Sequence, residues 1–285
     1  MSRLNELSKG VYRTHAPGHT LPPYVGTECY WIGDSREVVL IDTGDGGPAA
    51  QSALEDGWRE LGEPIVRAIV ATHHHDDHSG GGSWGAARFH CSVFMHPRDI
   101  ERLEERHPGQ SSGWERLASG TWQVGGRSID VLEAPGHTPG QCNIWIPDTG
   151  VLLAGDNVLG NTTSVISPPE GDLADYLTTL ERLKDLKPRI LGPGHGDVVS
   201  DPVSYLSHYL SHRHQRSQQM LALLQEEGGM TRTDLARRIY RGILSEDNLA
   251  PGEWMVQGHL DWFMARGVVF QDSGVYRKVD DHDFS

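Results

Sequence analysis

Five short apolar runs in this sequence each end on an aspartate or a histidine, and this repeated pattern restricts the possible folds more than any other feature. Each run is flanked by glycine or proline and contains β-branched residues, which is typical of a buried strand. The five residues that follow the runs are Asp42, His73, His137, Asp156 and His195. Because loops at one edge of the sheet build the site in layered α/β proteins, we expect these side chains to share a single site.

Helical stretches lie between the apolar runs. Residues 49–62 follow two glycines and a proline, and residues 172–187 carry leucines at helical spacing, with Asp172 as the N-cap and Pro188 as the stop. The order of strands and helices is not a strict βαβ alternation, so the sequence predicts a mixed α/β protein. Two sheets with helices on their outer faces would account for this order.

A domain boundary is expected near Asp201, which divides the chain into a catalytic domain of residues 1–200 and a small domain of residues 201–285. Residues 203–226 form one long helical stretch, and two shorter helical stretches follow it. Residues 267–279 then predict a β-hairpin. Three helices and a terminal hairpin indicate a winged-helix-like arrangement.

Some residues of this C-terminal part carry polar or aromatic side chains that need an interpretation. His208, His212 and Arg213 lie on the long helix, and we expect them on a solvated or packed face. The i, i+4 spacing of His208 and His212 would alternatively let them face the site or a third metal. Trp254, Trp262 and Phe263 on the third helix are expected in its apolar core.

The net charge of −14 argues against a polyanionic partner. Acidic residues exceed basic ones in both parts of the chain, and no basic stripe of the kind that binds nucleic acid is visible. No apolar run approaches the roughly 20 residues needed to span a bilayer, and no secretory signal is apparent. Three scattered cysteines, Cys29, Cys91 and Cys142, argue against a disulfide framework. We therefore expect a cytoplasmic protein without a membrane partner.

The segment ATHHHDDHSGGG, residues 71–82, has the spacing H-x-H-x-D-H. Imidazole nitrogens and carboxylates are the ligands that zinc and similar ions accept. Alternating His73 and His75 in an extended loop point the same way and can share one metal. Asp77 and His78 then face another direction and can serve a second metal.

Three further residues would complete the cage, because each sits in a rigid turn rich in glycine or proline. They are His137 in APGHTPG, Asp156 in LLAGDN and His195 in GPGHGD. A single histidine in such a turn is more often a hydrogen-bonded structural residue, but the combination with the 71–82 cluster favours metal binding. His74 and Asp76 would point elsewhere and are left out of the ligand set.

These motifs together resemble the metallo-β-lactamase superfamily. The matching elements are T-H-x-H-x-D-H-S-G-G, P-G-H-T, G-D and G-P-G-H-G, and Ile41–Gly44 looks like the early I-D-T-G strand end of that family. The resemblance covers about residues 10–200. It implies an α/β fold, an αββα sandwich with the site at one edge, followed here by the small helical, winged-helix-like domain.

The resemblance also implies the role of each ligand. It assigns the first metal to His73, His75 and His137, and the second to Asp77, His78 and His195. It makes Asp156 the bridge between the two metals and Asp42 a support that does not bind metal itself.

The C-terminal sequence is similar to the lactamase-β-2-like branch of this superfamily. Members of that branch include an endoribonuclease, and related proteins hydrolyse acyl thioesters on carrier proteins. The sequence departs from the family at residues 27–31, where Glu28 places a carboxylate near the expected mouth of the site. That carboxylate argues against an anionic RNA substrate.

The sequence therefore predicts a metal-dependent hydrolase with two zinc ions, although manganese or iron would also suit the ligands. A metal-bound hydroxide, oriented by Asp77 and Asp156, would attack a small or carrier-bound acyl substrate such as a thioester or ester. Three alternatives stay open: a metal-dependent endoribonuclease, a mononuclear iron dioxygenase of sulfur compounds, and a non-catalytic binding module. Asn161, Thr162 and Thr163 either line the mouth or form an ordinary polar turn. The sequence does not define the oligomeric state.

Overall fold

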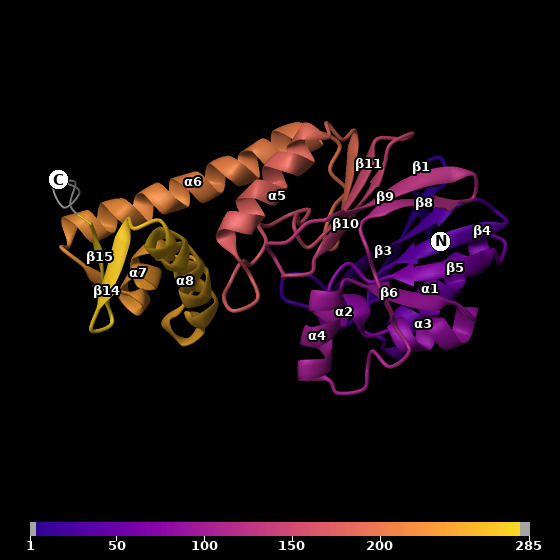
Figure 1. The fold of residues 1–285 in the computed structure, drawn as a ribbon, viewed down its shortest axis with the longest axis horizontal. Helices are drawn as coiled ribbons and strands as arrows, with labels where there is room; N and C mark the ends of the chain where they lie inside the picture. Colours follow the sequence, from indigo (N-terminus) through magenta and orange to yellow (C-terminus); the bar gives the residue numbers. More distant parts are fainter. Residues whose placement is uncertain (1–3, 280–285) are drawn as a thin grey trace.

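Two β-sheets pack face to face in the computed structural model, which describes residues 4–279 (Figure 1). The first sheet has seven strands, which lie side by side in chain order: β1 Leu4–Ser8, β2 Val11–Pro17, β3 Gly26–Gly33, β4 Glu37–Ile41, β5 Ile65–Val70, β6 Ser92–Met95 and β7 Glu115–Arg116. The second sheet has five strands, in spatial order β12 Ile190–Pro193, β11 Val151–Gly155, β10 Cys142–Ile146, β9 Arg127–Glu133 and β8 Gly120–Val124.

Helices cover the outer faces of both sheets, and further helices form the C-terminal region. In chain order the helices are α1 Pro48–Glu60, α2 Asp76–Ser79, α3 Gly82–Phe89, α4 Pro97–Arg106, α5 Leu173–Asp185, α6 Pro202–Glu226, α7 Arg232–Ile239, the short 3-10 helix Glu246–Asn248 and α8 Ala250–Ala265. Leu54 of α1 and Phe89 of α3 pack on the first sheet, and Leu180 of α5 and Leu206 of α6 pack on the second. This layering confirms the αββα prediction. Within residues 4–279, every helix is too short or too polar to cross a bilayer.

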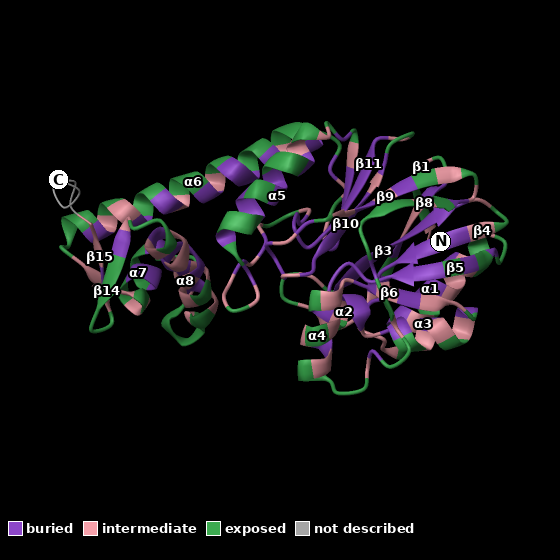
Figure 2. Cartoon of the chain, in the orientation of Figure 1, coloured by how far each residue is buried: buried purple, intermediate pink, exposed green. Residues whose placement is uncertain are grey.

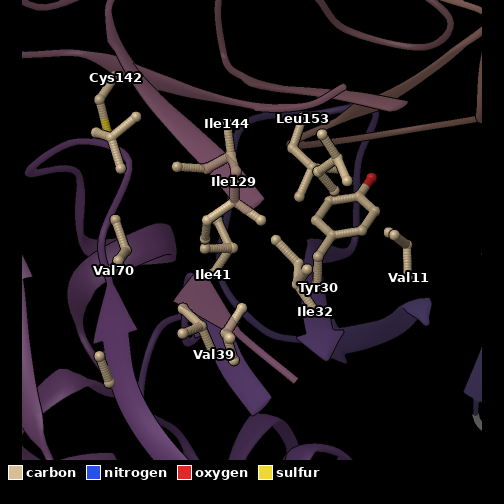
Figure 3. Close-up of a cluster of buried hydrophobic side chains, with 14 of the residues drawn as sticks. Val11, Tyr30, Ile32, Val39, Ile41, Val70, Ile129, Cys142, Ile144 and Leu153 are labelled. Carbon is tan, nitrogen blue, oxygen red and sulfur yellow. The ribbon is translucent and has the colours of Figure 1, made fainter. Parts of the chain in front are cut away.

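The space between the sheets is filled by aliphatic side chains from both (Figure 3). Val39 and Ile41 of β4 meet Ile129 of β9 and Ile144 of β10 in one buried cluster. Successive side chains along each strand point to opposite faces of the sheet. One face of each sheet therefore supplies this cluster, and the other contacts the helices. Burial of these apolar surfaces away from water is the main contribution to the stability of the sandwich.

The carboxyl ends of the strands place the site at one edge of the sandwich. β4 and β5 are parallel, as are β11 and β12. The loop with His73 follows β5, while Asp156 and His195 follow β11 and β12. A backbone hydrogen bond of 2.9 Å from Cys142 N to Thr72 O joins the two sheets at this edge. The five-strand prediction is therefore correct in outline, with the strand ends distributed over two sheets.

The C-terminal region continues directly from the sandwich through α6, the long helix that leaves it in Figure 1. Beyond the end of α5, this helix packs with α7, α8 and a small sheet of β13 Met230–Thr231, β15 Val275–Lys278 and β14 Val269–Asp272. The predicted helices and hairpin are all present, while the winged-helix likeness stays a prediction. Phe263 is buried as expected and Trp262 is partly buried, but Trp254 is 51% exposed, so its placement in the core was wrong. Figure 2 shows the alternating buried and exposed faces of α6.

The substitution Ile144→Ala tests the packing between the sheets. Ile144 is fully buried, and its truncation should lower the free energy of unfolding by about 2–5 kcal/mol, because it removes apolar contacts and leaves a cavity. Urea unfolding measures the loss. Ile65→Ala on β5 is the matched control, since Ile65 is 59% exposed and should change stability by about 0.5 kcal/mol or less. Equal losses for the two variants would contradict the placement of Ile144.

The substitution His259→Gln tests the interior of the C-terminal region. Burial, assisted by the charge of Arg213, lowers the pKa of His259 on α8 to about 3. The unfolded chain binds this proton near pH 6.5, so stability should decrease as the pH falls from 6.5 towards 3. Between pH 7 and 5, the wild-type free energy of unfolding should fall by about 2 kcal/mol more than that of the variant. Parallel pH profiles in chemical denaturation would contradict this assignment.

Candidate metal centre

One group of three histidines lies at the edge of the sandwich where loops from both sheets meet. His73 follows β5, His75 is the N-cap of α2, and His137 comes from the loop after β9. His73 Nε2 lies 3.0 Å from His75 Nδ1, and His137 Nε2 lies 3.1 Å from the same atom. Their ring nitrogens converge closely enough to hold one metal ion.

A second group contains Asp77, His78 and His195. His78 Nε2 and His195 Nε2 are 3.1 Å apart, and Asp77 Oδ2 is 3.3 Å from His195 Nε2. Asp156 lies between the two groups. Its Oδ1 is 3.2 Å from His78 Nε2, and its Oδ2 is 3.4 Å from His195 Nε2 and 3.8 Å from His137 Nε2. The structure thus brings together all seven side chains that the sequence nominated.

Each of the five histidines has an acceptor for its outward ring nitrogen. The pairs are His73 Nδ1 with Thr72 Oγ1, His75 Nε2 with Glu170, His78 Nδ1 with Asp42, His137 Nδ1 with the Val165 carbonyl and His195 Nδ1 with the Gly26 carbonyl. A neutral imidazole that donates from one nitrogen presents a lone pair on the other. With all five rings neutral, as metal binding requires, five lone pairs would face inward, together with the carboxylates of Asp77 and Asp156. This donor set fits divalent metal ions.

Asp42 organises the base of the site without facing its centre. Its carboxylate accepts from the backbone N–H of Thr72 at 2.7 Å, from the Thr72 hydroxyl at 2.9 Å and from His78 Nδ1 at 2.8 Å. The Thr72 hydroxyl, having donated to Asp42, can accept from His73. One carboxylate thereby orients a histidine in each group, which agrees with the supporting role expected for it.

The two groups differ in electrostatic character. Burial lowers the pKa of His73 and lowers that of His137 to about 4, so both rings are neutral. Burial also acts on His195, but Asp156 and Asp77 outweigh it and raise the pKa to about 10. His195 and His78 hold the pKa of Asp156 well below its usual range despite its burial. The second group therefore has the more negative surroundings, because the carboxylates of Asp77 and Asp156 both lie beside His195.

A buried cluster next to the first group was not predicted. His74, expected to point elsewhere, is fully buried and bonds through Nδ1 to Asp99 and through Nε2 to Glu170. Burial opposes protonation, but these carboxylates raise the pKa of His74 to about 9. Asp76 points outward to His107 Nε2 at 2.9 Å, as expected. Asp99 and Glu170 do not follow the end of an apolar run, so the sequence pattern did not indicate them.

The loop between β2 and β3, residues 18–25, borders the opposite side of the site. Thr20 donates to Asp77 Oδ2 at 2.5 Å. The ring of Tyr24 stacks on His195 with centroids 5.2 Å apart, and its hydroxyl lies 2.7 Å from Thr162 Oγ1. Thr162 therefore contacts the loop that borders the site.

Glu28 does not occupy the mouth, so that interpretation was wrong. It is only 7% exposed, and its carboxylate lies 2.9 Å from His15 Nδ1 and 3.5 Å from Arg13 Nε. It lies in β3, which is hydrogen-bonded to β2, and strand pairing turns its side chain toward those residues. The carboxylate is thus no barrier to an anionic substrate.

Residues 22–195 match the family described as the Metallo-beta-lactamase superfamily. The chain belongs to the metallo-beta-lactamase superfamily. Its similarity extends to hydrolases, among them a protein named Atrochrysone carboxyl ACP thioesterase from Aspergillus chevalieri, which is 28% identical over 78% of this chain and 70% of its own length. Beta-lactamase-like protein 2 homolog from Caenorhabditis elegans is 30% identical over 83% of this chain and 78% of that protein. The chain is accordingly a hydrolase of this superfamily.

Solved structures extend the likeness to the C-terminal region. A metallo-beta-lactamase family protein from Thermus thermophilus superposes with a TM-score of 0.80 at 25% identity, over 96% of this chain and 100% of that one. A Beta-lactamase domain protein from Burkholderia ambifaria gives a TM-score of 0.82 at 20% identity, over 97% and 93%. The helical extension is therefore part of the shared fold.

The substitution Glu170→Gln tests the support of the first group. It removes the carboxylate that accepts from His75 Nε2, so the ring is less firmly held with Nδ1 inward. Metal affinity should fall by about 10-fold or more, measured by competition with a chromophoric chelator. Glu133→Gln, at an exposed position on β9, is the control and should leave affinity unchanged. An unchanged affinity in Glu170→Gln would refute the role of this carboxylate.

Proposed function

We propose that this protein is a dizinc hydrolase that cleaves a thioester or ester of a small or carrier-bound acyl group. The observation that carries the proposal is the convergence of five inward-facing imidazole nitrogens and two carboxylates. The first metal would bind His73, His75 and His137, and the second Asp77, His78 and His195. Asp156 would bridge them, because its carboxylate lies near His137 of the first group and near His78 and His195 of the second.

A bound zinc pair supplies a water activated near neutral pH and positive charge for the carbonyl oxygen under attack. Asp77 and Asp156 would orient that water and accept its hydrogen bonds. Thr20 restrains the Asp77 carboxylate through its hydroxyl. Tyr24 covers one face of His195. A thiol leaving group has an ordinary pKa of about 8.5 and departs readily as the thiolate, which suits a site built around nucleophile activation.

The surroundings of the mouth support an acyl substrate. The loop that carries Thr20 and Tyr24 also carries Leu21 and Val25, which are 68% and 72% exposed. Exposed apolar side chains next to a polar centre favour a substrate with an apolar portion. The net charge of −14 disfavours long polyanions. The thioesterase named among the relatives agrees with this substrate class.

We also propose that the protein works in the reducing cytoplasm on a small-molecule or carrier-bound partner. All three cysteines are free, and Cys29 and Cys142 are buried. Such thiols need no oxidising compartment.

Metal analysis and a small substrate panel test the proposal. Purified protein should contain two zinc ions per chain, and it should hydrolyse an acyl thioester faster than a lactone or a short single-stranded RNA. One iron per chain would instead support oxidation of a sulfur compound. Turnover of RNA alone would make the endoribonuclease alternative the correct one.

The substitution Asp156→Asn tests the bridging position with little change of shape. Loss of one negative oxygen from the centre should lower the metal content below two per chain and reduce kcat by about 100-fold or more. Asp197→Asn is the matched control, because Asp197 bonds to Asn161 nearby but contacts no proposed ligand. Full metal content together with normal turnover in Asp156→Asn would exclude the bridge.

A further inference from the structure

The segment from residue 157 to residue 171, here called the central loop, lies between the metal centre and the C-terminal helices. Towards the centre it makes several contacts. The Val165 carbonyl accepts from His137 Nδ1 at 2.9 Å, and Glu170 accepts from His75 Nε2 at 3.0 Å. The Ser164 hydroxyl donates to the Asp156 carbonyl oxygen at 2.6 Å. The position of this loop therefore affects both groups of ligands.

On its other side, the central loop is held by α6 and α8. The Leu159 N–H donates to the Tyr209 hydroxyl at 2.9 Å, and Arg213 donates from Nη2 to the Ser164 carbonyl. From α8, Met255 Sδ accepts from the Ile166 N–H at 3.3 Å. Both helices belong to the C-terminal region, so only the central loop separates this region from the metal centre.

The approach of α8 is close enough to exclude a larger residue. A Cβ atom added at Gly258 would lie 2.9 Å from the Ile166 carbonyl oxygen. Because that neighbour is backbone, an alanine here would push the central loop by a few tenths of an ångström. The substitution Gly258→Ala would therefore displace the central loop without removing a charged side chain.

Arg213 is the most unusual of these contacts. Its side chain is only 2% exposed, and no carboxylate of the described residues forms an ion pair with it. Its guanidinium carbon lies 5.2 Å from the centre of the Tyr176 ring, and Nε has no hydrogen-bond partner within the described chain. A buried cation without a counter-charge is costly, so a purely packing role would be served better by an apolar residue. Its charge-assisted bond to Ser164 is instead strong and directional.

We propose that Arg213 is a positioning residue through which the C-terminal region sets the metal affinity of the first group. The bond from Nη2 fixes the Ser164 carbonyl, and the next residue, Val165, fixes the ring of His137. The inference rests on the proposed metal centre. It gives the C-terminal helices a part in the site.

Zinc affinity of the full-length protein, measured by chelator competition, tests this proposal. Arg213→Met keeps the aliphatic volume but removes the donor, and it should weaken zinc binding by about 10-fold. Arg213→Lys keeps a donor and a charge and should restore part of that loss. Arg216→Met is the matched control, since Arg216 lies on the same helix but bonds to Gln219 and the Ile239 carbonyl within the C-terminal region. It should retain wild-type affinity.

A spectroscopic measurement separates positioning from general destabilisation. With Co²⁺ in place of zinc, Arg213→Met should shift the visible absorption bands, which report ligand geometry, whereas Arg216→Met should not. Gly258→Ala should also shift these bands, and it replaces Arg213→Met in the test if that variant does not fold. Unchanged affinity and spectrum in Arg213→Met or, if it does not fold, in Gly258→Ala would overturn the inference, as would equal changes in Arg216→Met. Absence of metal binding by the wild type would instead reject the proposed metal centre, and this inference with it.

Discussion

The structure depends on hydrogen bonds that point away from the metal centre. Five imidazole rings can bind metal together only if each directs its N–H outward, because this leaves the inward nitrogen free to act as a ligand. The acceptors come from two carboxylates, one hydroxyl and two backbone carbonyls. The two backbone carbonyls reach their histidines only when segments far apart in the chain have folded together. The ligand geometry is therefore a property of the whole fold.

The sandwich explains how these acceptors reach the site. Parallel strand pairs in both sheets end at one edge, and the apolar cluster between the sheets sets the distance between those ends. Aliphatic packing thus fixes the scaffold, and the polar network fixes the side chains upon it. Asp42 links the two levels, because it follows a core strand and orients Thr72 and His78.

The sequence could predict the fold class and the set of converging side chains because both follow from local patterns. Apolar runs that end on His73, Asp156 or His195 show where strands stop and ligands begin. The contribution of Glu170 and Arg213 was not predictable, since each acts through a contact between segments far apart in the chain. Glu28 was misplaced for a related reason: the period-two alternation of β3 and its pairing with β2, not nearness to the site in sequence, decide where it points.

The continuity of α6 has a consequence for how this chain can vary. The helix has 25 residues, a length of about 37 Å, and it passes from the outer layer of the sandwich into the C-terminal region without a break. Insertion or deletion of one residue ahead of Arg213 would rotate everything beyond it by about 100°. The guanidinium would then miss the Ser164 carbonyl, and the apolar cluster formed with α7 and α8 would turn to another side of the helix. The length of the first three turns of α6 is therefore fixed by the contacts at both of its ends.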